Sequence, residues 1–292
     1  MLRNPAQRFT AGMLGLMLVV LLRADVRVVG TDLLGVDFSK ALYAFAVSHD
    51  WRLVLTLDGS RPGLVELEAG RADLALLVIP PDEELPRGFE SIQLAYYRVV
   101  VLVPATSPLP ALTLDQLAGI FGAAGRARFA RWGELGLTGD WADAAIESHA
   151  PAVGTGLAIE LFRHVALQGG SLKSTVHRFR APTDLSVHFL GDSRGIVIAP
   201  GPVPNAPGMK IVPVAARERE PAFLPSPENL DSGDYPLRLP LRIVFRRESV
   251  PGLSELIRFL LSGEGGLLLE RAQVVPLPLA ARRRHLLALE RF

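Results

Sequence analysis

The N-terminal third of the chain alternates short β-branched segments with amphipathic ones, and this order restricts the possible folds more than any other feature. Strands are expected at 26–30, 52–59 and 73–80, with helices at 36–49 and 63–70 between them. Successive strands that are separated by a helix pair in parallel, because a parallel connection needs a crossover. The sequence therefore predicts an α/β fold with helices flanking a parallel sheet.

The rest of the chain indicates two lobes rather than one. The apolar segment 91–110 is long enough for two strands, or for one that continues beyond a domain edge, and it ends in prolines. A Pro-, Glu- and Ser-rich loop follows Ala216, and "PLRLPLRIVF" then returns to strand. Two such crossings predict two lobes with a cleft between them, the first lobe made of 25–103 and 235–292 and the second of 104–234.

Helix patterns within these lobes are clear. Phe38, Leu42, Phe45 and Ala46 share one face of the first expected helix. Thr113 is the expected N-cap of a helix that begins the second lobe. Near the C-terminus, "GLSELIRFLLSGEGGLLLERA" predicts a helix that is interrupted at 263–266, where three of four residues are glycine.

The N-terminal 24 residues have the pattern of an export signal. A basic head, "MLRNPAQR", precedes the uncharged stretch "FTAGMLGLMLVVLL", which is shorter than a membrane-spanning helix requires. We interpret residues 1–24 as a Sec-type signal peptide and the protein as periplasmic or secreted, with an uncleaved N-terminal anchor as the alternative. The sequence contains no cysteine, so there is no lipobox for a lipid anchor.

Composition argues against several functional classes. The 292 residues carry 31 basic and 30 acidic side chains, a formal net charge of +1, so bulk charge indicates neither a nucleic-acid partner nor a membrane surface. "GDSRG" places Ser193 in a G-x-S-x-G pattern, but a strand-like segment follows where a nucleophile elbow needs a helix. The six histidines lack metal-ligand spacing, and "RRRH" at 282–285 reads as a solvated helix face. We expect no enzyme, no metal and no cofactor.

Loops that lead into helices suggest anion capture instead. Thr31 follows the first strand in "GTDLLG", Ser60 and Arg61 open a helix in "DGSRPGL", and Gly154 and Thr155 precede another helix in "VGTG". Each loop can offer backbone N–H groups and a hydroxyl to an anion. Each is equally consistent with ordinary capping and turn chemistry, and only their order along two lobes favours a shared site.

Longer motifs resemble the periplasmic phosphate-binding proteins of ABC transporters, the PstS type, over nearly all of the chain beyond the signal. "GRADLAL" is similar to the family's G-x-x-D-I-A strand, and "YPLRLPL" to its Y-P-L-x-R-P-L return strand. "VGTGLAIELF" resembles its S-G-T-x-x-x-F helix start, and "LLSGEGGLLLERAQVVPL" its C-terminal segment. The segment 112–146 carries its F-x-G and W-x-x-l-G pattern in this set of residues: Leu117, Ile120, Phe121, Gly122, Trp132 and Gly136.

The resemblance implies the two-lobed type 2 periplasmic-binding-protein fold, each lobe a mixed sheet flanked by helices, which closes like a hinge on its ligand. In this family hydroxyls, backbone N–H groups, an arginine and an aspartate hold phosphate. By position, the resemblance assigns ligand contacts to Thr31, Ser60, Asp73, Gly154 and Thr155.

Two positions depart from the family pattern. His149 stands where the family has its arginine, and Val153 where it has the serine of S-G-T. Arg61 beside Ser60, or a protonated His149, is expected to supply the missing positive charge, unless Arg61 is only a solvated loop residue.

The functional prediction is a monomeric solute-binding protein that captures phosphate, or a similar small oxyanion, for an ABC permease. The alternative is a scaffold or interaction module that has kept the fold and lost the ligand.

Overall fold

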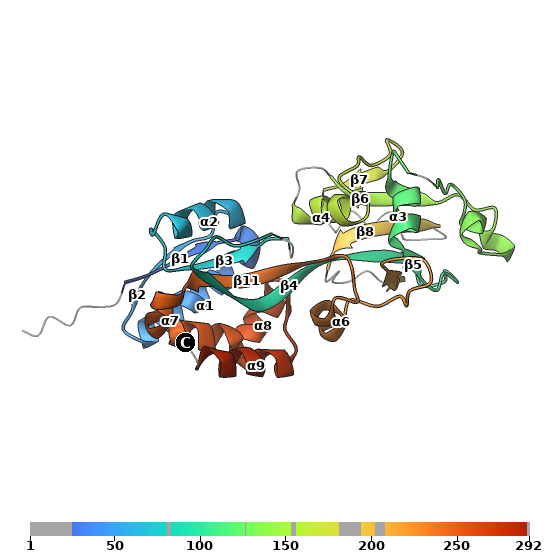
Figure 1. The fold of residues 1–292 in the computed structure, drawn as a ribbon. Coiled ribbons are helices and arrows are strands. Elements are labelled where there is room, and N and C mark those ends of the chain that lie inside the picture. The colour runs from blue at the N-terminus through green and yellow to red at the C-terminus, as the bar shows by residue number, and fades with distance from the viewer. Residues whose placement is uncertain are drawn as a thin grey trace, which may run out of the picture.

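The elements that the sequence predicts in the first lobe form in the expected order. The computed structural model describes residues 25–80, 83–125, 127–152, 156–180, 194–201 and 208–290, and the expected signal segment 1–24 lies outside them. Figure 1 shows two bodies of mixed α/β structure that are joined by long strands running from one to the other.

The strands are β1 (Asp25–Gly30), β2 (Arg52–Thr56), β3 (Leu74–Val78), β4 (Phe89–Pro104), β5 (Leu112–Thr113), β6 (Glu147–Pro151), β7 (His177–Phe179), β8 (Gly195–Pro200), β9 (Met209–Ile211), β10 (Val214–Ala215), β11 (Arg238–Arg246) and β12 (Val275–Pro276). The helices are α1 (Gly35–Ser48), α2 (Ser60–Glu68), α3 (Leu114–Phe121), α4 (Leu157–Val165), α6 (Pro227–Ser232), α7 (Val250–Leu261), α8 (Gly263–Arg271) and α9 (Leu279–Leu289). Short 3-10 turns are η1 (Asp32–Leu34), η2 (Trp132–Leu135), η3 (Gly139–Trp141) and η4 (Arg247–Ser249).

Local signals account for several of these boundaries. Thr113 caps α3 through a full capping box, accepting a hydrogen bond from the Gln116 amide while the Gln116 side chain accepts one from the Thr113 amide. The expected C-terminal interruption is present, but it lies at Ser262, where α7 and α8 meet, and residues 263–266 form the first turn of α8. The apolar face of α1 is also confirmed, with Phe38 and Leu42 fully buried.

One mixed sheet runs through both bodies, in the order β2-β1-β3-β11-β4-β8-β6-β7. The strands β2, β1 and β3 are mutually parallel, as predicted, and β8, β6 and β7 form a second parallel group. Between these groups lie β11 and β4, which are antiparallel to their neighbours. Two parallel half-sheets are therefore joined by an antiparallel centre.

The long segment 91–110 forms one strand and not two. Strand β4 has 16 residues and pairs with β11 as far as Arg98, which lies opposite Arg238. From Val99 onward it pairs with β8, beginning opposite Pro200. The strand thus passes from the first lobe to the second at the bond between Arg98 and Val99.

Helices cover the two faces of the first half-sheet unequally. In Figure 1, α2 lies above the sheet, whereas α1, α7, α8 and α9 lie below it. Helix α7 buries its apolar face against this layer, including Leu253, Leu256, Ile257 and Leu260. Over the residues that the structure describes, we find no helix with the length and apolar character needed to cross a bilayer.

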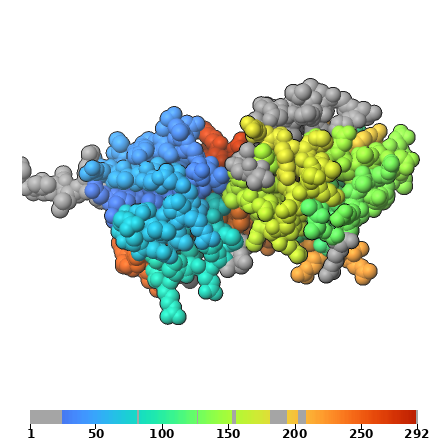
Figure 2. Space-filling view, turned by 90° about the horizontal axis from the view of Figure 1, so that it is seen from above, coloured from blue at the N-terminus to red at the C-terminus, as the bar shows by residue number. Residues whose placement is uncertain are grey.

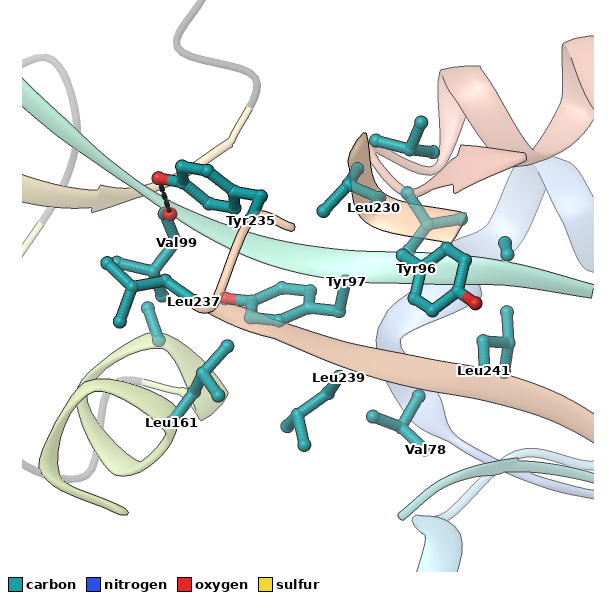
Figure 3. Packing of buried hydrophobic residues seen from close by; sticks show 14 of the residues in the cluster. Val78, Tyr96, Tyr97, Val99, Leu161, Leu230, Tyr235, Leu237, Leu239 and Leu241 are labelled. Atoms are coloured by element: carbon teal, nitrogen blue, oxygen red, sulfur yellow. Dashed lines mark hydrogen bonds between the residues drawn. The ribbon is translucent and has the colours of Figure 1, made fainter. Parts of the chain in front are cut away.

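Buried aromatic side chains fill the place where the two long strands cross between the lobes. Tyr235, immediately before β11, is completely buried, and its hydroxyl donates a 2.7 Å hydrogen bond to the carbonyl oxygen of Val99 on β4 (Figure 3). Leu237 and Tyr97 pack beside it (Figure 3). This bond joins the two crossing segments at the first residue that belongs to the second lobe.

The substitution Tyr235→Phe is expected to lower the free energy of unfolding by about 1–2 kcal/mol, since it leaves a buried carbonyl without its donor. Denaturant titration followed by circular dichroism measures the effect. Tyr43→Phe is the matched control, because Tyr43 is 45% exposed on α1 and its substitution should change stability by less than about 0.5 kcal/mol. Equal effects of the two substitutions would contradict this role for the Tyr235 hydroxyl.

Candidate functional site

Thr31 lies at the carboxyl end of β1, where the chain turns into η1. Its side chain is 2% exposed, and its hydroxyl oxygen accepts a 3.3 Å hydrogen bond from the Leu33 amide. Its own amide donates to the carbonyl oxygen of Leu76 on β3. The preceding Gly30 has φ 141°, and a Cβ there would lie 2.0 Å from the same Leu76 oxygen, so the turn requires glycine.

Ser60 lies beside this turn, at the start of α2. Its hydroxyl oxygen accepts a 2.8 Å hydrogen bond from the amide of Val78, at the carboxyl end of β3. The preceding amide, of Gly59, donates to the carbonyl oxygen of Gly30. A Cβ on Gly63 would lie 2.8 Å from the Gly30 Cα, so the first turn of α2 packs directly on the β1 turn. The structure therefore brings Thr31 and Ser60 to one edge of the half-sheet.

The hydroxyls of Thr31 and Ser60 have the same hydrogen-bonding pattern. Each accepts one backbone N–H, and within the described residues neither hydroxyl proton has a protein acceptor. A hydroxyl is one donor and two acceptor positions, so an accepted bond fixes the group while its proton remains free to donate. Two O–H donors fixed in this way, beside the uncapped N-terminus of the nine-residue helix α2, favour an anionic ligand over a cationic one.

Arg61 is held by a neighbouring acid in the structure. Its guanidinium makes a bidentate ion pair with Glu83, with Nη1 at 2.7 Å from Oε1 and Nη2 at 3.0 Å from Oε2. The Arg61 side chain is 73% exposed, whereas that of Glu83 is 21% exposed. In this arrangement the Glu83 carboxylate neutralises the charge of Arg61, which was expected to replace the arginine of the family pattern.

Asp73, to which the family resemblance assigned a ligand contact, lies away from Thr31 and Ser60, and its ligand role stays a prediction. Asp73 directly precedes β3, and its carboxylate accepts hydrogen bonds from the amide, Nε and Nη2 of Arg27 on β1. The hydroxyl site is at the other end of β3, about 16 Å along the strand at the usual rise per residue. The ion pair with Asp73 raises the pKa of Arg27, as expected for a structural pair.

Val78, and not an acidic residue, is what β3 brings to the edge that carries Thr31 and Ser60. It is the last residue of the strand, and its amide is the group that holds the Ser60 hydroxyl. Its apolar side chain adds no charge to that edge. The described part of the first lobe therefore offers neutral donors to an anion and no buried carboxylate beside them.

In the second lobe, His149 lies on the central strand β6 of the parallel group. It is 7% exposed, and its ring stacks on that of His177 on β7, with the centroids 5.0 Å apart. The strand leads towards α4, whose N-cap residue Gly156 has φ 139°. Val153, Gly154, Thr155 and Ser193 lie outside the described residues, so the predictions on them stay predictions.

Helix α2, which begins at Ser60, and helix α4, which follows the strand of His149, lie on a common side of the crossing strands. Helices α2 and α4 lie on the upper side in Figure 1, and Figure 2 looks down on that side. It shows an indentation between the blue-cyan first lobe and the yellow-green second lobe, with the red-orange C-terminal part of the chain visible within it. Nothing in the described ranges forms a group of three or more histidine, cysteine or acidic side chains that could hold a metal.

Glu83, the partner of Arg61, is the residue at this edge that sequence reasoning missed. It belongs to the acidic run "DEE" after β3, which has no helical or strand periodicity to indicate its direction. Its negative charge was the signal that could have indicated an ion pair with Arg61. A further signal was its loop, which follows β3 and lies beside the loop that leads to Ser60 and Arg61. A loop acid of this kind finds its partner through tertiary structure, which a one-dimensional pattern does not encode.

Comparison with solved structures shows which fold this is. A possible phosphate binding protein from Planctomyces limnophilus matches with a TM-score of 0.69 at 19% identity, over 92% of this chain and 98% of that one. PstS from Borrelia burgdorferi matches with a TM-score of 0.70 at 14% identity, over 88% and 100%. An ABC-type phosphate transport receptor from Vibrio cholerae matches with a TM-score of 0.61 at 16% identity, over 86% and 99%.

The chain thus has the two-lobed type 2 periplasmic-binding-protein fold that the motifs predicted, and it shares this fold with PstS proteins. No protein-family model matches the chain, and no curated protein matches it in sequence.

The substitution Asp73→Asn is expected to lower the free energy of unfolding by about 1 kcal/mol, because it weakens three hydrogen bonds from Arg27 at a partly exposed site. It should leave anion binding unchanged, since the carboxylate lies at the opposite end of β3. Asp37→Asn is the control, because Asp37 pairs with Lys40 on the exposed surface of α1. Loss of anion affinity in the Asp73 variant, at unchanged stability, would support the ligand role that the family resemblance implied.

Proposed function

We propose that the protein is an extracytoplasmic solute-binding protein that captures a small oxyanion, phosphate first, between its two lobes. It acts as a monomer outside the cytoplasm, binds without catalysis, and delivers its ligand to an ABC-type permease. The fold shared with phosphate receptors supports this proposal, and so does the residue chemistry at the edge of the first half-sheet.

The observation that carries the proposal is the pair of fixed hydroxyl donors, Thr31 and Ser60. Each is anchored by an accepted backbone N–H, which leaves its hydroxyl proton available to a ligand. An oxyanion accepts such bonds without competition from the protein, and a hydrogen bond to a charged group contributes about 1.5–3 kcal/mol. The hydroxyls recognise the geometry of an oxyanion and not its exact charge, so they suit phosphate and related ions alike.

The second lobe would contribute the backbone N–H groups that precede α4, together with Gly154 and Thr155. His149 lies in the middle of β6, the strand that leads towards α4, and supplies a positive charge when it is protonated. Arg61 is the second source of charge, provided that the ligand draws it away from Glu83. These roles complete a site that the first lobe begins with neutral donors.

A specific observation favours a second candidate, a module that has kept the fold and binds no small anion. The bidentate pair between Arg61 and Glu83 consumes the nearest cation, and Val78 leaves an apolar residue at the edge of the site. A protein of this kind would use the indentation between the lobes for a macromolecular partner instead. The binding measurement below separates the two candidates.

Calorimetric titration with phosphate at pH 6 and pH 8, with sulfate as the reference anion, tests the proposal directly. We expect binding by the wild type, and an affinity about ten- to a hundredfold lower in Thr31→Val and in Ser60→Ala. Ser39→Ala is the matched control, since the Ser39 hydroxyl donates only to the carbonyl of Gly35 on the exposed side of α1. The absence of heat with both anions would favour the ligand-free module.

The variant Glu83→Gln tests whether Arg61 takes part. Removing the carboxylate frees the guanidinium, so phosphate affinity is expected to rise by about tenfold if Arg61 reaches the ligand. Arg61→Ala should then lower affinity, and the double variant should resemble Arg61→Ala. Unchanged affinity in both single variants would leave Arg61 as a solvated residue that pairs with Glu83.

A further inference from the structure

Arg98 stands at the point where β4 changes partners, and its side chain is in an unusual state. It is the last β4 residue to pair with β11, and Val99 is the first to pair with β8. Its Nε and Nη1 atoms are buried, and neither has a hydrogen-bond partner in the described part of the chain. An unsatisfied buried donor on a charged group is costly, and native structures contain few of them.

The surroundings hold this guanidinium in place without satisfying it. A Cβ at Gly201 would lie 2.8 Å from the Arg98 Nε, so the glycine leaves just enough space for the side chain. The Gly201 amide also donates to the Arg98 carbonyl oxygen. Burial lowers the pKa of Arg98 from its ordinary value, and the nearby Tyr235 opposes this shift. The guanidinium nevertheless stays charged, because arginine is not deprotonated in proteins.

Arg98 also lines a cavity of about 250 Å³. The walls are mostly apolar and come from Pro225 in the loop before α6, from Pro227 at the start of α6, and from Val274, Val275 and Pro276. The last lining residue is Glu270, an exposed carboxylate near the end of α8. Helices α6 and α8 lie below the crossing strands in Figure 1, whereas α2 and α4 lie above them, so this cavity is separate from the anion site.

The cavity therefore combines one cation, one anion and an apolar wall. A simple anion would be attracted by the guanidinium and repelled by the Glu270 carboxylate. A simple cation would be attracted by Glu270 and repelled by Arg98. A molecule that carries a carboxylate and an ammonium group on a short apolar body complements all three features. Nε and Nη1 are themselves buried, so the carboxylate would meet the charge of Arg98 at the cavity wall and not at these two atoms.

We propose that the cavity lined by Arg98, Glu270 and the Val274–Pro276 segment is a second binding site, for a small α-amino acid with an apolar side chain. The carboxylate of the ligand pairs with Arg98, its ammonium group with Glu270, and its side chain with the valines and prolines. The site is independent of the proposed oxyanion function, since it shares no residue with it.

Calorimetric titration with L-valine tests the site, with isovalerate, which lacks the ammonium group, as the comparison ligand. The wild type should bind L-valine about tenfold or more tightly than isovalerate, and Glu270→Gln should remove this preference. Arg98→Met should weaken L-valine binding by about tenfold or more, because it removes the charge at similar volume. Arg238→Met is the matched control, since Arg238 lies opposite Arg98 on β11, over the ring of Tyr96, and does not line the cavity.

Phosphate titrations of the same variants keep the two sites distinguishable, because none of these substitutions touches Thr31 or Ser60. No binding of L-valine by the wild type would overturn the proposal, as would equal binding by the wild type and Arg98→Met. Isovalerate binding as tightly as L-valine would overturn the assignment to an amino acid. Should Arg98→Met fail to fold by circular dichroism, Arg98→Lys replaces it: weaker L-valine binding supports the site, and unchanged binding overturns it.

Discussion

The continuous hydrogen bonding of β4 is the constraint on which the rest of this structure depends. A strand of 16 residues pairs first with β11 and then with β8, so a single backbone belongs to both lobes. The relative placement of the lobes then depends on a few residues around Arg98 and Val99. At this junction β4 changes partners, and neither β11 nor β8 pairs with it on both sides. The buried bond from Tyr235 to Val99 ties the returning segment to this same point.

At the carboxyl edge of the first half-sheet, backbone geometry and side-chain chemistry reinforce each other. The close approach of α2 to Gly30 places the Ser60 hydroxyl next to the turn that carries Thr31. The accepted amides then fix both hydroxyls, so their orientation does not depend on a ligand. Positive charge is not available at this edge in the same way, because the Arg61 guanidinium is already paired with Glu83. Neutral donors are thus built in, whereas positive charge at this edge depends on a change of partner.

The sequence was most informative where a local pattern decides the structure. The parallel order of β2, β1 and β3, the capping box at Thr113 and the break at Ser262 all follow from periodicity or capping, which act over a few residues. The side-chain partners were not predictable in this way. The motif around Asp73 resembles a ligand-bearing segment, yet the strand carries that residue to the opposite end from Ser60. Contacts between distant loops depend on packing, and no short pattern records them.

The position of β11 in the sheet has a consequence for how the molecule is made. This strand lies between β3 and β4 in the sheet, although its first residue, Arg238, follows long after Pro104, the last residue of β4.

 Until that late segment has left the ribosome, β3 has an open edge, and its residues Leu74 to Val78 are all apolar. The second lobe, by contrast, lies almost entirely within one uninterrupted stretch of chain. The first lobe is therefore the last to close, and its unfinished edge is the surface that a nascent chain must keep from aggregating.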